Sequence, residues 1–246
     1  MKLILLAAGK GERLLPLTKE RSKLLLDMGN GKTLLDEQFE NIKKSGVIDE
    51  VVLIVGFMAE QIEEKVRGYS GNGIRVKTIY NPFYELSNNL ISLWFARGEM
   101  DGGFMVSNGD NLFNASVYRS LAQSASDGVY ITISRKERYD FDDMKVTLED
   151  GKVARIGKDI EGEAAHAESV GLSLVSGARH AALFSESLDG LVKRKENMNK
   201  FWLEVFNFMR LNGVDIRPYE IDGERNWREL DYHLDIEQVK RLIKMI

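Results

Sequence analysis

The chain has 246 residues, of which 43% are hydrophobic and 29% are charged, as in a soluble globular protein with a sizeable core. Its net charge of -4 excludes a global basic field that would hold nucleic acid. The absence of cysteine excludes disulfides, thiolate zinc sites and cysteine nucleophiles, and it fits a reducing compartment. No apolar run has the length of a signal peptide core or a membrane span. We therefore expect a cytoplasmic protein that binds neither membranes nor nucleic acid.

Strand-like and helix-like patterns alternate through the first half of the chain. Apolar runs predict strands at 2–7, 50–56, 74–80 and 103–108, and helical spacing predicts helices at 33–46, 58–68, 86–100 and 114–125. The first helix has Thr33 and Gly46 as sensible caps. This alternation is typical of a parallel sheet covered by helices.

The second half opens with consecutive strands. We predict strands at 128–134, 143–149, 151–157 and 168–176, with a turn at 149–152, which indicates an antiparallel addition to the same sheet. A helix at 198–213, a strand at 215–221 and a helix at 235–246 close the chain. Proline is scarce and no linker is visible, so we expect one domain spanning residues 1–246.

A glycine-rich, strongly basic loop, "LLAAGKGERLLPLTKERSKLLL" (5–26), directly follows the first predicted strand. Glycines let the backbone fold tightly and point its N–H groups inward, which makes a cradle for an anion. Arg13 and Lys23 add full charges that can reach one polyphosphate. The alternative is a solvated basic loop, but the ordered recurrence of glycine, arginine and lysine favours phosphate binding.

Two common phosphate-binding motifs do not fit this loop. The dinucleotide fingerprint needs a third glycine where Leu14 stands. A Walker A loop ending at Gly31-Lys32-Thr33 would need its first glycine at Leu26. We interpret Gly31-Lys32-Thr33 as a hairpin turn followed by a helix cap. The missing third glycine and the basic loop also exclude an NAD-dependent oxidoreductase.

The segment "LAAGKGERLLPLT…SKLLL" resembles the signature of nucleotidyltransferases that join a nucleotide to a phosphorylated small molecule, roughly L-A-[AG]-G-x-G-x-R-[ML]-x-P-x-T…P-K-x-[LM]. Ser22 stands where sugar-specific members have proline before the lysine. The resemblance implies that the loop wraps the triphosphate and base of an incoming nucleotide. It implies nucleotide contacts from Leu6, Ala7, Ala8, Gly9 and Gly11.

Three further segments resemble the cytidylyltransferase branch, whose members act on phosphocholine, 2-aminoethylphosphonate and related phosphonates. They are "YNPFYELSNNLISLWFAR" (80–97), "DDMKVTLEDGKVARIGKDI" with "AHAESVGLSLVS" (142–176), and "NWRELDYHLDIEQVKRL" (226–242). Ala167 replaces the glycine usual before Glu168. The resemblance implies an α/β, Rossmann-like three-layer sandwich: a mixed, mostly parallel sheet with helices on both faces and an antiparallel β addition. Residues 1–125 would form the nucleotide-binding half and 126–246 the acceptor-binding half of one nucleotidyltransferase domain.

The implied reaction is magnesium-dependent transfer of CMP from CTP to a small phosphate or phosphonate acceptor, with release of pyrophosphate. The resemblance assigns Asp110 and Asp231 to Mg²⁺; taken alone, each would be interpreted as a helix cap, but the glycine-rich loop and the resemblance together favour the metal. Arg13 and Lys23 would neutralise the phosphates. Lys145 would approach the α-phosphate or the acceptor phosphate, or else is a solvent-facing strand lysine.

Polar and aromatic residues supply candidates for recognising the base and the acceptor. We predict that Asn88, Asn89 and Ser92 read the cytosine edge, and we include Asn108 among the nucleotide-binding residues. For the acceptor head group we predict four contacts: the acids Glu168 and Glu229, which suit an ammonium, and the aromatic residues Trp202 and Tyr139. The apolar stripe around Trp202 also favours a simple core position.

Two rival functions remain open at this point. One is a sugar-1-phosphate nucleotidyltransferase that makes a nucleotide sugar, which Ser22 and the "SNNLISL" segment disfavour. The other is a non-catalytic nucleotide-sensing module, which the presence of Arg13, Lys23, Asp110 and Asp231 disfavours. The sequence leaves open the acceptor head group, strict use of CTP and whether the chain forms a homodimer.

Overall fold

The computed structural model describes residues 1–69 and 73–246. Its strands are β1 (Lys2–Ala7), β2 (Glu50–Val55), β3 (Arg75–Tyr80), β4 (Phe104–Asn108), β5 (Asn111–Phe113), β6 (Gly128–Ser134), β7 (Lys145–Glu149), β8 (Lys152–Gly157), β9 (Ala167–Ser176), β10 (Ile216–Glu220) and β11 (Trp227–Glu229). Its α-helices are α1 (Leu34–Ser45), α2 (Ala59–Arg67), α3 (Asn89–Phe95), α4 (Ala115–Ser124), α5 (Ala178–Val192), α6 (Glu204–Leu211), α7 (Gly223–Asn226) and α8 (His233–Ile243). In these described ranges, no helix is long and apolar enough to cross a bilayer.

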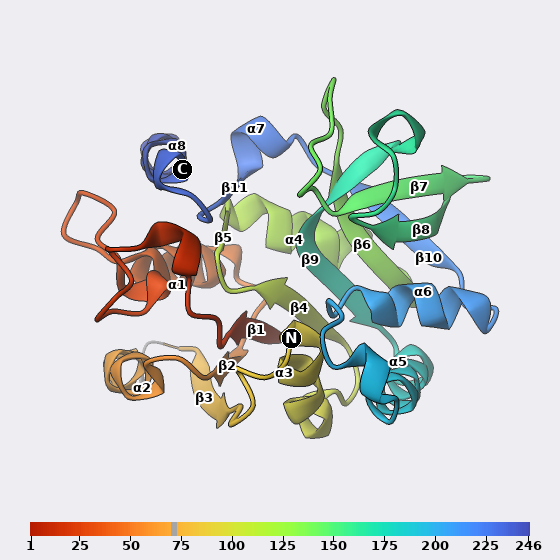
Figure 1. Cartoon of the computed structure of the whole chain (residues 1–246), viewed down its shortest axis with the longest axis horizontal. Coiled ribbons are helices and arrows are strands. Elements are labelled where there is room, and N and C mark those ends of the chain that lie inside the picture. The colour runs from red at the N-terminus through yellow and green to blue at the C-terminus, as the bar shows by residue number, and fades with distance from the viewer. Residues whose placement is uncertain (70–72) are drawn as a thin grey trace.

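One mixed sheet runs through the molecule (Figure 1). Its strands follow the order β10-β6-β9-β4-β1-β2-β3, and β7 and β8 extend from β9. β1, β2, β3 and β4 pair in parallel, and so do β6 and β10, whereas β9 is antiparallel to both β4 and β6. The predicted mixed, mostly parallel sheet with an antiparallel addition is therefore confirmed.

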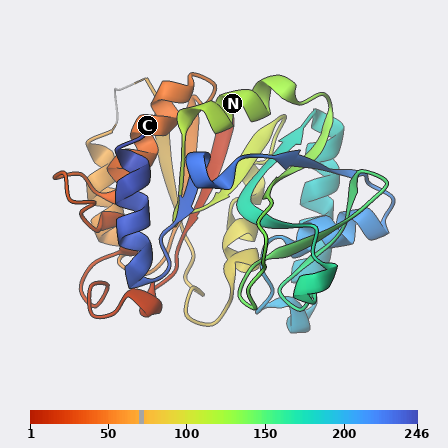
Figure 2. The same cartoon turned by 90° about the horizontal axis from the view of Figure 1, so that it is seen from above.

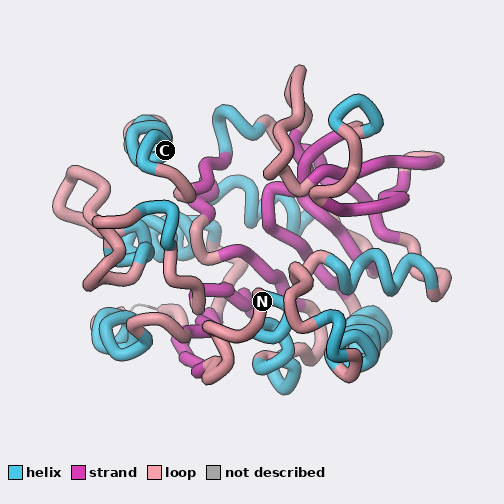
Figure 3. The backbone as a smooth tube through the Cα atoms, in the orientation of Figure 1, coloured by secondary structure: helices cyan, strands magenta, loops and turns pink. Residues whose placement is uncertain are grey.

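Helices cover both faces of the sheet (Figures 2 and 3). Along β1, Leu3 and Leu5 pack into the core shared with α1, α2 and α4, whereas Ile4 and Leu6 pack into the core shared with α3, α5 and α6. This alternation follows from the two-residue period of a strand. A central strand with apolar residues on both faces has to be covered on both sides, which gives three layers.

The elements differ from the sequence predictions in several places: β5, α7 and β11 were not predicted, and the helix expected over 86–100 is regular only from Asn89 to Phe95. Helix α5 was not predicted, and the helix expected over 198–213 is regular only from Glu204 to Leu211. The predicted turn at 149–152 is confirmed: Asp150 and Gly151 have φ values of 50° and 74°, the left-handed pair of a tight hairpin. Thr33 caps α1 as predicted, with its side chain accepting a hydrogen bond from the Asp36 amide.

Helix α8 packs against the segment that follows β1, so the last helix lies beside the basic loop (Figure 2). A third apolar cluster, distinct from the two sheet cores, joins Leu14 and Leu26 to Leu230, Val239 and Leu242. Leu230 is fully buried in this cluster. The packing therefore brings the next residue, Asp231, to the glycine-rich loop.

We predict that Phe184→Ala lowers the free energy of unfolding by about 3–5 kcal/mol, measured by urea denaturation. Phe184 is fully buried, and its ring contacts those of Phe104 and Phe206 with centroids 5.4 and 5.5 Å away. Phe141→Ala is the matched control, because Phe141 is 87% exposed and its loss should leave the unfolding free energy nearly unchanged. Equal effects of the two variants would contradict this account of the core.

Candidate functional site

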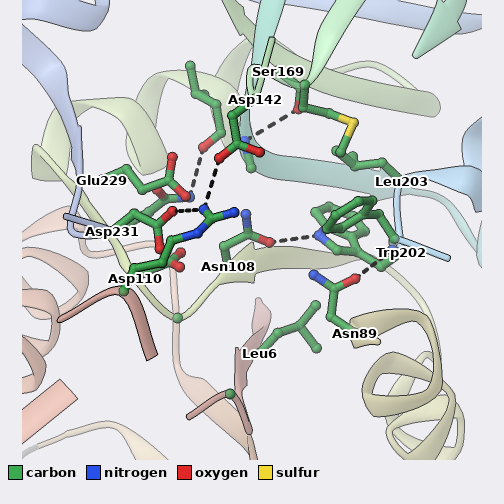
Figure 4. A pocket seen from close by; sticks show the side chains of 18 of the residues that line it. Leu6, Asn89, Asn108, Asp110, Asp142, Ser169, Trp202, Leu203, Glu229 and Asp231 are labelled. Carbon is green, nitrogen blue, oxygen red and sulfur yellow. Dashed lines mark hydrogen bonds and ion pairs between the residues drawn. The ribbon is translucent and has the colours of Figure 1, made fainter. Parts of the chain in front are cut away.

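A cavity of about 960 Å³ opens where β1 and β4 end and β9 begins. Ligands of open α/β sheets bind at the carboxyl ends of parallel strands, and this cavity lies at that edge. Acidic side chains gather on one side, and Asn89, Asn108 and Trp202 lie on the other (Figure 4). The cavity is thus charged at one end and largely uncharged at the other.

Most residues predicted from the sequence line this cavity. They are Leu6, Ala7, Ala8, Gly9, Gly11, Arg13, Lys23, Asn88, Asn89, Ser92, Asn108, Asp110, Glu168, Trp202, Glu229 and Asp231. The structure brings them together from both halves of the chain.

Lys23 is the centre of the charged end. Its Nζ lies 2.8 Å from Asp110 Oδ2 and 3.6 Å from Asp231 Oδ1. Burial disfavours the charged ammonium, but Asp110 and Asp231 outweigh burial and raise the pKa of Lys23. One buried cation therefore joins the two acids predicted to bind metal.

Arg13 extends the charged network across the cavity. Its guanidinium donates to both Asp231 and Asp142, and it lies over the ring of Tyr232 at 5.2 Å from the centroid. The preceding turn depends on Gly11, whose φ of +65° is left-handed and whose absent Cβ would lie 3.3 Å from Lys23 Cβ. The glycine thus lets the loop approach Lys23 closely before it places Arg13.

The backbone around Asp110 is held in place by a side chain of helix α1. The buried side chain of Gln38 on α1 donates to the carbonyls of Gly109 and Asn111, both at 2.8 Å. Asp110 Oδ2 accepts from Lys23, but the buried Oδ1 has no hydrogen-bond partner among the described residues. A buried carboxylate oxygen without a partner is costly unless a ligand pairs with it.

A divalent cation fits this arrangement. Mg²⁺ commonly takes one or two carboxylates and completes its shell with phosphate oxygens and water. Asp110 and Asp231 supply two carboxylates, including the unpaired Asp110 oxygen. No group of three or more His, Cys, Asp or Glu side chains able to hold a metal occurs in the parts of the chain described, so the remaining ligands would come from substrate and water.

Glu229, the last residue of β11, lies beside Asp110 and Asp231, and its side chain points to them in Figure 4. Loss of hydration among the surrounding protein atoms, followed by repulsion from the charges of Asp110 and Asp231, raises the pKa of Glu229 to about 8. The side chain nevertheless stays accessible from the cavity. Its sequence-based role in acceptor binding stays a prediction.

Two predicted residues do not line the cavity. Lys145 is 2% exposed, and its Nζ donates to the carbonyls of Asp140, Asp143 and, at 3.4 Å, Phe141. The side chain turns back to the loop before β7 because carbonyl oxygens there compensate its buried charge. Tyr139 faces Lys136, whose Nζ lies 5.9 Å from its ring centroid.

Two lysines absent from the predicted site do line the cavity. Lys136 pairs with Asp143 and Glu168, both at 2.8 Å, and Lys158 pairs with Asp142 and lies over the ring of Phe201. Burial raises the pKa of Glu168 against the opposing charge of Lys136. Lys158 lies in the segment "DDMKVTLEDGKVARIGKDI" that resembles the cytidylyltransferase branch, so a signal for it was present.

Comparison with known proteins adds independent findings. The family model described as "Nucleotidyl transferase" matches residues 2–143. The choline-phosphate cytidylyltransferase of Streptococcus pneumoniae is 30% identical over 94% of this chain and 97% of its own length. The CTP:phosphoglutamine cytidylyltransferase of Campylobacter jejuni is 25% identical over 96% of this chain and 98% of its own. A solved structure of CTP:phosphocholine cytidylyltransferase from Streptococcus pneumoniae has a TM-score of 0.79 and 25% identity, with 98% of each chain covered.

We predict that Gly171→Ala destabilises the fold more than Gly151→Ala. Both glycines have left-handed φ values, +72° and +74°. A Cβ at Gly171 would lie 2.5 Å from the amide nitrogens of Asn108 and Asn111, whereas a Cβ at Gly151 meets nothing within 4 Å. Backbone strain should therefore cost both variants about 1 kcal/mol, and the clash should add about 1–3 kcal/mol at Gly171. Urea denaturation measures both, and equal losses would show that the two amides move aside freely.

Proposed function

The chain belongs to the nucleotidyl transferase family, in its cytidylyltransferase branch, and we propose that it transfers CMP from CTP to a small phosphate or phosphonate acceptor with release of pyrophosphate. The observation that carries the proposal is the position of Lys23 between Asp110 and Asp231, with Arg13 alongside, at one end of a single cavity. That end combines cations for phosphates with carboxylates for a metal. The full-length similarity to two cytidylyltransferases supports CTP as the donor.

The nucleotide would lie along the cavity from its uncharged to its charged end. Asn88, Asn89 and Ser92 at the start of α3 line the same cavity as Leu6, and together they would offer polar groups and an apolar surface for a pyrimidine. The triphosphate would then reach Arg13 and Lys23. In this arrangement, hydrogen bonds at the uncharged end would determine the affinity for the base. Ionic contacts at the charged end would determine the affinity for the phosphates.

The chemical step needs no protein nucleophile. An oxygen of the acceptor phosphate attacks the α-phosphorus, a P–O bond forms, and the bond to the bridging oxygen breaks as pyrophosphate leaves with its electron pair. Both reactants are anions, so the chain contributes positioning and positive charge. Arg13 and Lys23 would neutralise the departing pyrophosphate. Bound Mg²⁺, held by Asp110 and Asp231, would supply further charge neutralisation on phosphate oxygens.

The acceptor would occupy the part of the cavity lined by Lys136, Lys158 and Glu168. The lysines suit its phosphate or phosphonate. Glu168, predicted to face an ammonium, already pairs with Lys136, as Asp143 does, and Asp142 pairs with Lys158, so the head group would add to a set of ion pairs. Phe141 and Phe201 also line this region and offer the aromatic surface that a methylated ammonium prefers.

Pyrophosphate release tests the proposal. The protein is incubated with magnesium, each of CTP, UTP, ATP and GTP, and phosphocholine, 2-aminoethylphosphonate or glucose-1-phosphate. We expect the fastest release with CTP and one of the first two acceptors. Fastest release from glucose-1-phosphate with UTP would replace the proposal with sugar nucleotide synthesis, and no release from any pair would indicate a non-catalytic sensor.

We predict that Asp110→Ala lowers turnover by at least about a hundredfold, because the loss of a metal-binding carboxylate costs several kcal/mol of transition-state stabilisation. Circular dichroism checks that the variant folds. Asp215→Ala is the control, because Asp215 pairs with Lys152 at the surface and its loss should leave turnover unchanged. A folded Asp110→Ala protein with near-normal turnover at low magnesium would remove Asp110 from the metal site.

We predict that Lys23→Ala lowers turnover by about a hundredfold, whereas Lys10→Ala changes it less than about twofold. Both lysines belong to the basic loop. Lys23 is buried against Asp110, whereas Lys10 pairs with Glu85 at the surface and does not line the cavity. Steady-state turnover measures both, and similar losses would mean that the loop acts as a diffuse charge.

A further inference from the structure

Trp202 donates two hydrogen bonds into the cavity wall (Figure 4). Its indole Nε1 donates to Asn108 Oδ1 at 2.7 Å, and its backbone N–H donates to Asn89 Oδ1 at 2.8 Å. Asn108 ends β4, Asn89 begins α3, and Trp202 lies just before α6. One residue of the second half thus holds two amides of the first half.

These bonds determine which way each amide faces. An indole N–H and a backbone N–H can only donate, so each must face an amide oxygen. The nitrogen of each amide therefore lies on the other side, and Figure 4 shows both nitrogens turned away from Trp202. Among the residues that the structure describes, neither Nδ2 of Asn89 nor Nδ2 of Asn108 donates a hydrogen bond, although both residues line the cavity.

Two other asparagines near the cavity show that this pattern is not general. Asn111 accepts from the indole of Trp227 at 2.9 Å, and its Nδ2 donates to the Val170 carbonyl at 2.9 Å. Asn81 likewise donates to Ser92 and accepts from the Phe83 amide. Both are satisfied within the protein, as buried amides usually are. The open donors of Asn89 and Asn108 therefore point to a ligand.

The Trp202 side chain is held firmly by its surroundings. Trp202 is 1% exposed and its ring contacts that of Phe206 edge-on, with centroids 5.6 Å apart. Gly171 has no side chain, which leaves room for the Asn108 amide, because a Cβ there would lie 2.5 Å from its Nδ2. A rotation of the Asn108 amide would set its N–H groups against the indole N–H, which is repulsive.

We infer that Trp202 is a positioning residue that makes Asn89 and Asn108 hydrogen-bond donors toward the base, and that these donors select cytosine over uracil. This inference rests on the proposed function. Cytosine carries two adjacent acceptors, O2 and N3, that match two N–H donors. Uracil carries a donor at N3, which would meet a donor and leave both groups unpaired. An unpaired buried polar group lowers binding by about tenfold to a hundredfold.

The test measures kcat/KM for CTP and for UTP in wild type and in Trp202→Phe with a fixed acceptor. Phenylalanine keeps an aromatic ring but removes the indole N–H, so the Asn108 amide is free to turn its oxygen to the base. We expect the CTP-to-UTP ratio to fall by about tenfold or more. Trp94→Phe is the matched control, because it also removes an indole hydrogen bond, from Trp94 Nε1 to Asp189 at 2.7 Å, but outside the cavity. It should keep the wild-type ratio.

Asn108→Asp provides a second variant if Trp202→Phe does not fold. The carboxylate can still accept from the indole, but it presents an acceptor to the base in place of a donor, so the ratio should shift toward UTP. An unchanged ratio in either folded variant, or a change confined to the acceptor KM, would overturn the inference. Wild type that shows no preference for CTP would instead overturn the proposed function, before any variant is compared.

Discussion

The ammonium of Lys23 holds the site together. Its two carboxylate partners come from distant parts of the chain: Asp110 follows β4, and Asp231 precedes α8. A buried charge is tolerated only where opposite charges and hydrogen bonds compensate it. The C-terminal segment with α8 is therefore held against the basic loop in two ways. Leu14 and Leu230 make apolar contacts, and Lys23 makes an ion pair with Asp231. The same packing forms the charged end of the cavity.

The groups proposed to bind substrate already neutralise one another. Arg13 and Lys23 pair with the carboxylates of Asp110, Asp142 and Asp231. In the proposed reaction, a triphosphate entering with Mg²⁺ would exchange these partners: Arg13 and Lys23 would bind phosphate oxygens, and Asp110 and Asp231 would hold the metal. Such an exchange leaves few charges without a partner at any stage, so the protein has little desolvation to repay when substrate binds.

Sequence patterns predicted what depends on local geometry. The glycine-rich loop and Asp110 both follow apolar strands, and parallel strands end at one edge of a sheet, so their meeting was foreseeable. The direction of long side chains was harder to predict. A lysine at the start of a strand can point to a cavity or to its own loop, and Lys145 does the latter because carbonyls there are nearer. The sequence favoured a core position for Trp202, but its hydrogen bonds to two amides depend on tertiary contacts that no local pattern encodes.

The two ends of the cavity differ in how sharply they can discriminate. The end proposed for the base is built from short amides held by directional hydrogen bonds, and a mismatched base there would leave polar groups unpaired. The end proposed for the acceptor is built from ion pairs of long side chains, Lys136 and Lys158 with their acids, which can shift to suit different head groups. Selectivity for the nucleotide should therefore be steeper than selectivity for the acceptor. The two full-length relatives agree with this division, because both are cytidylyltransferases in name whereas their named acceptors, choline phosphate and phosphoglutamine, differ.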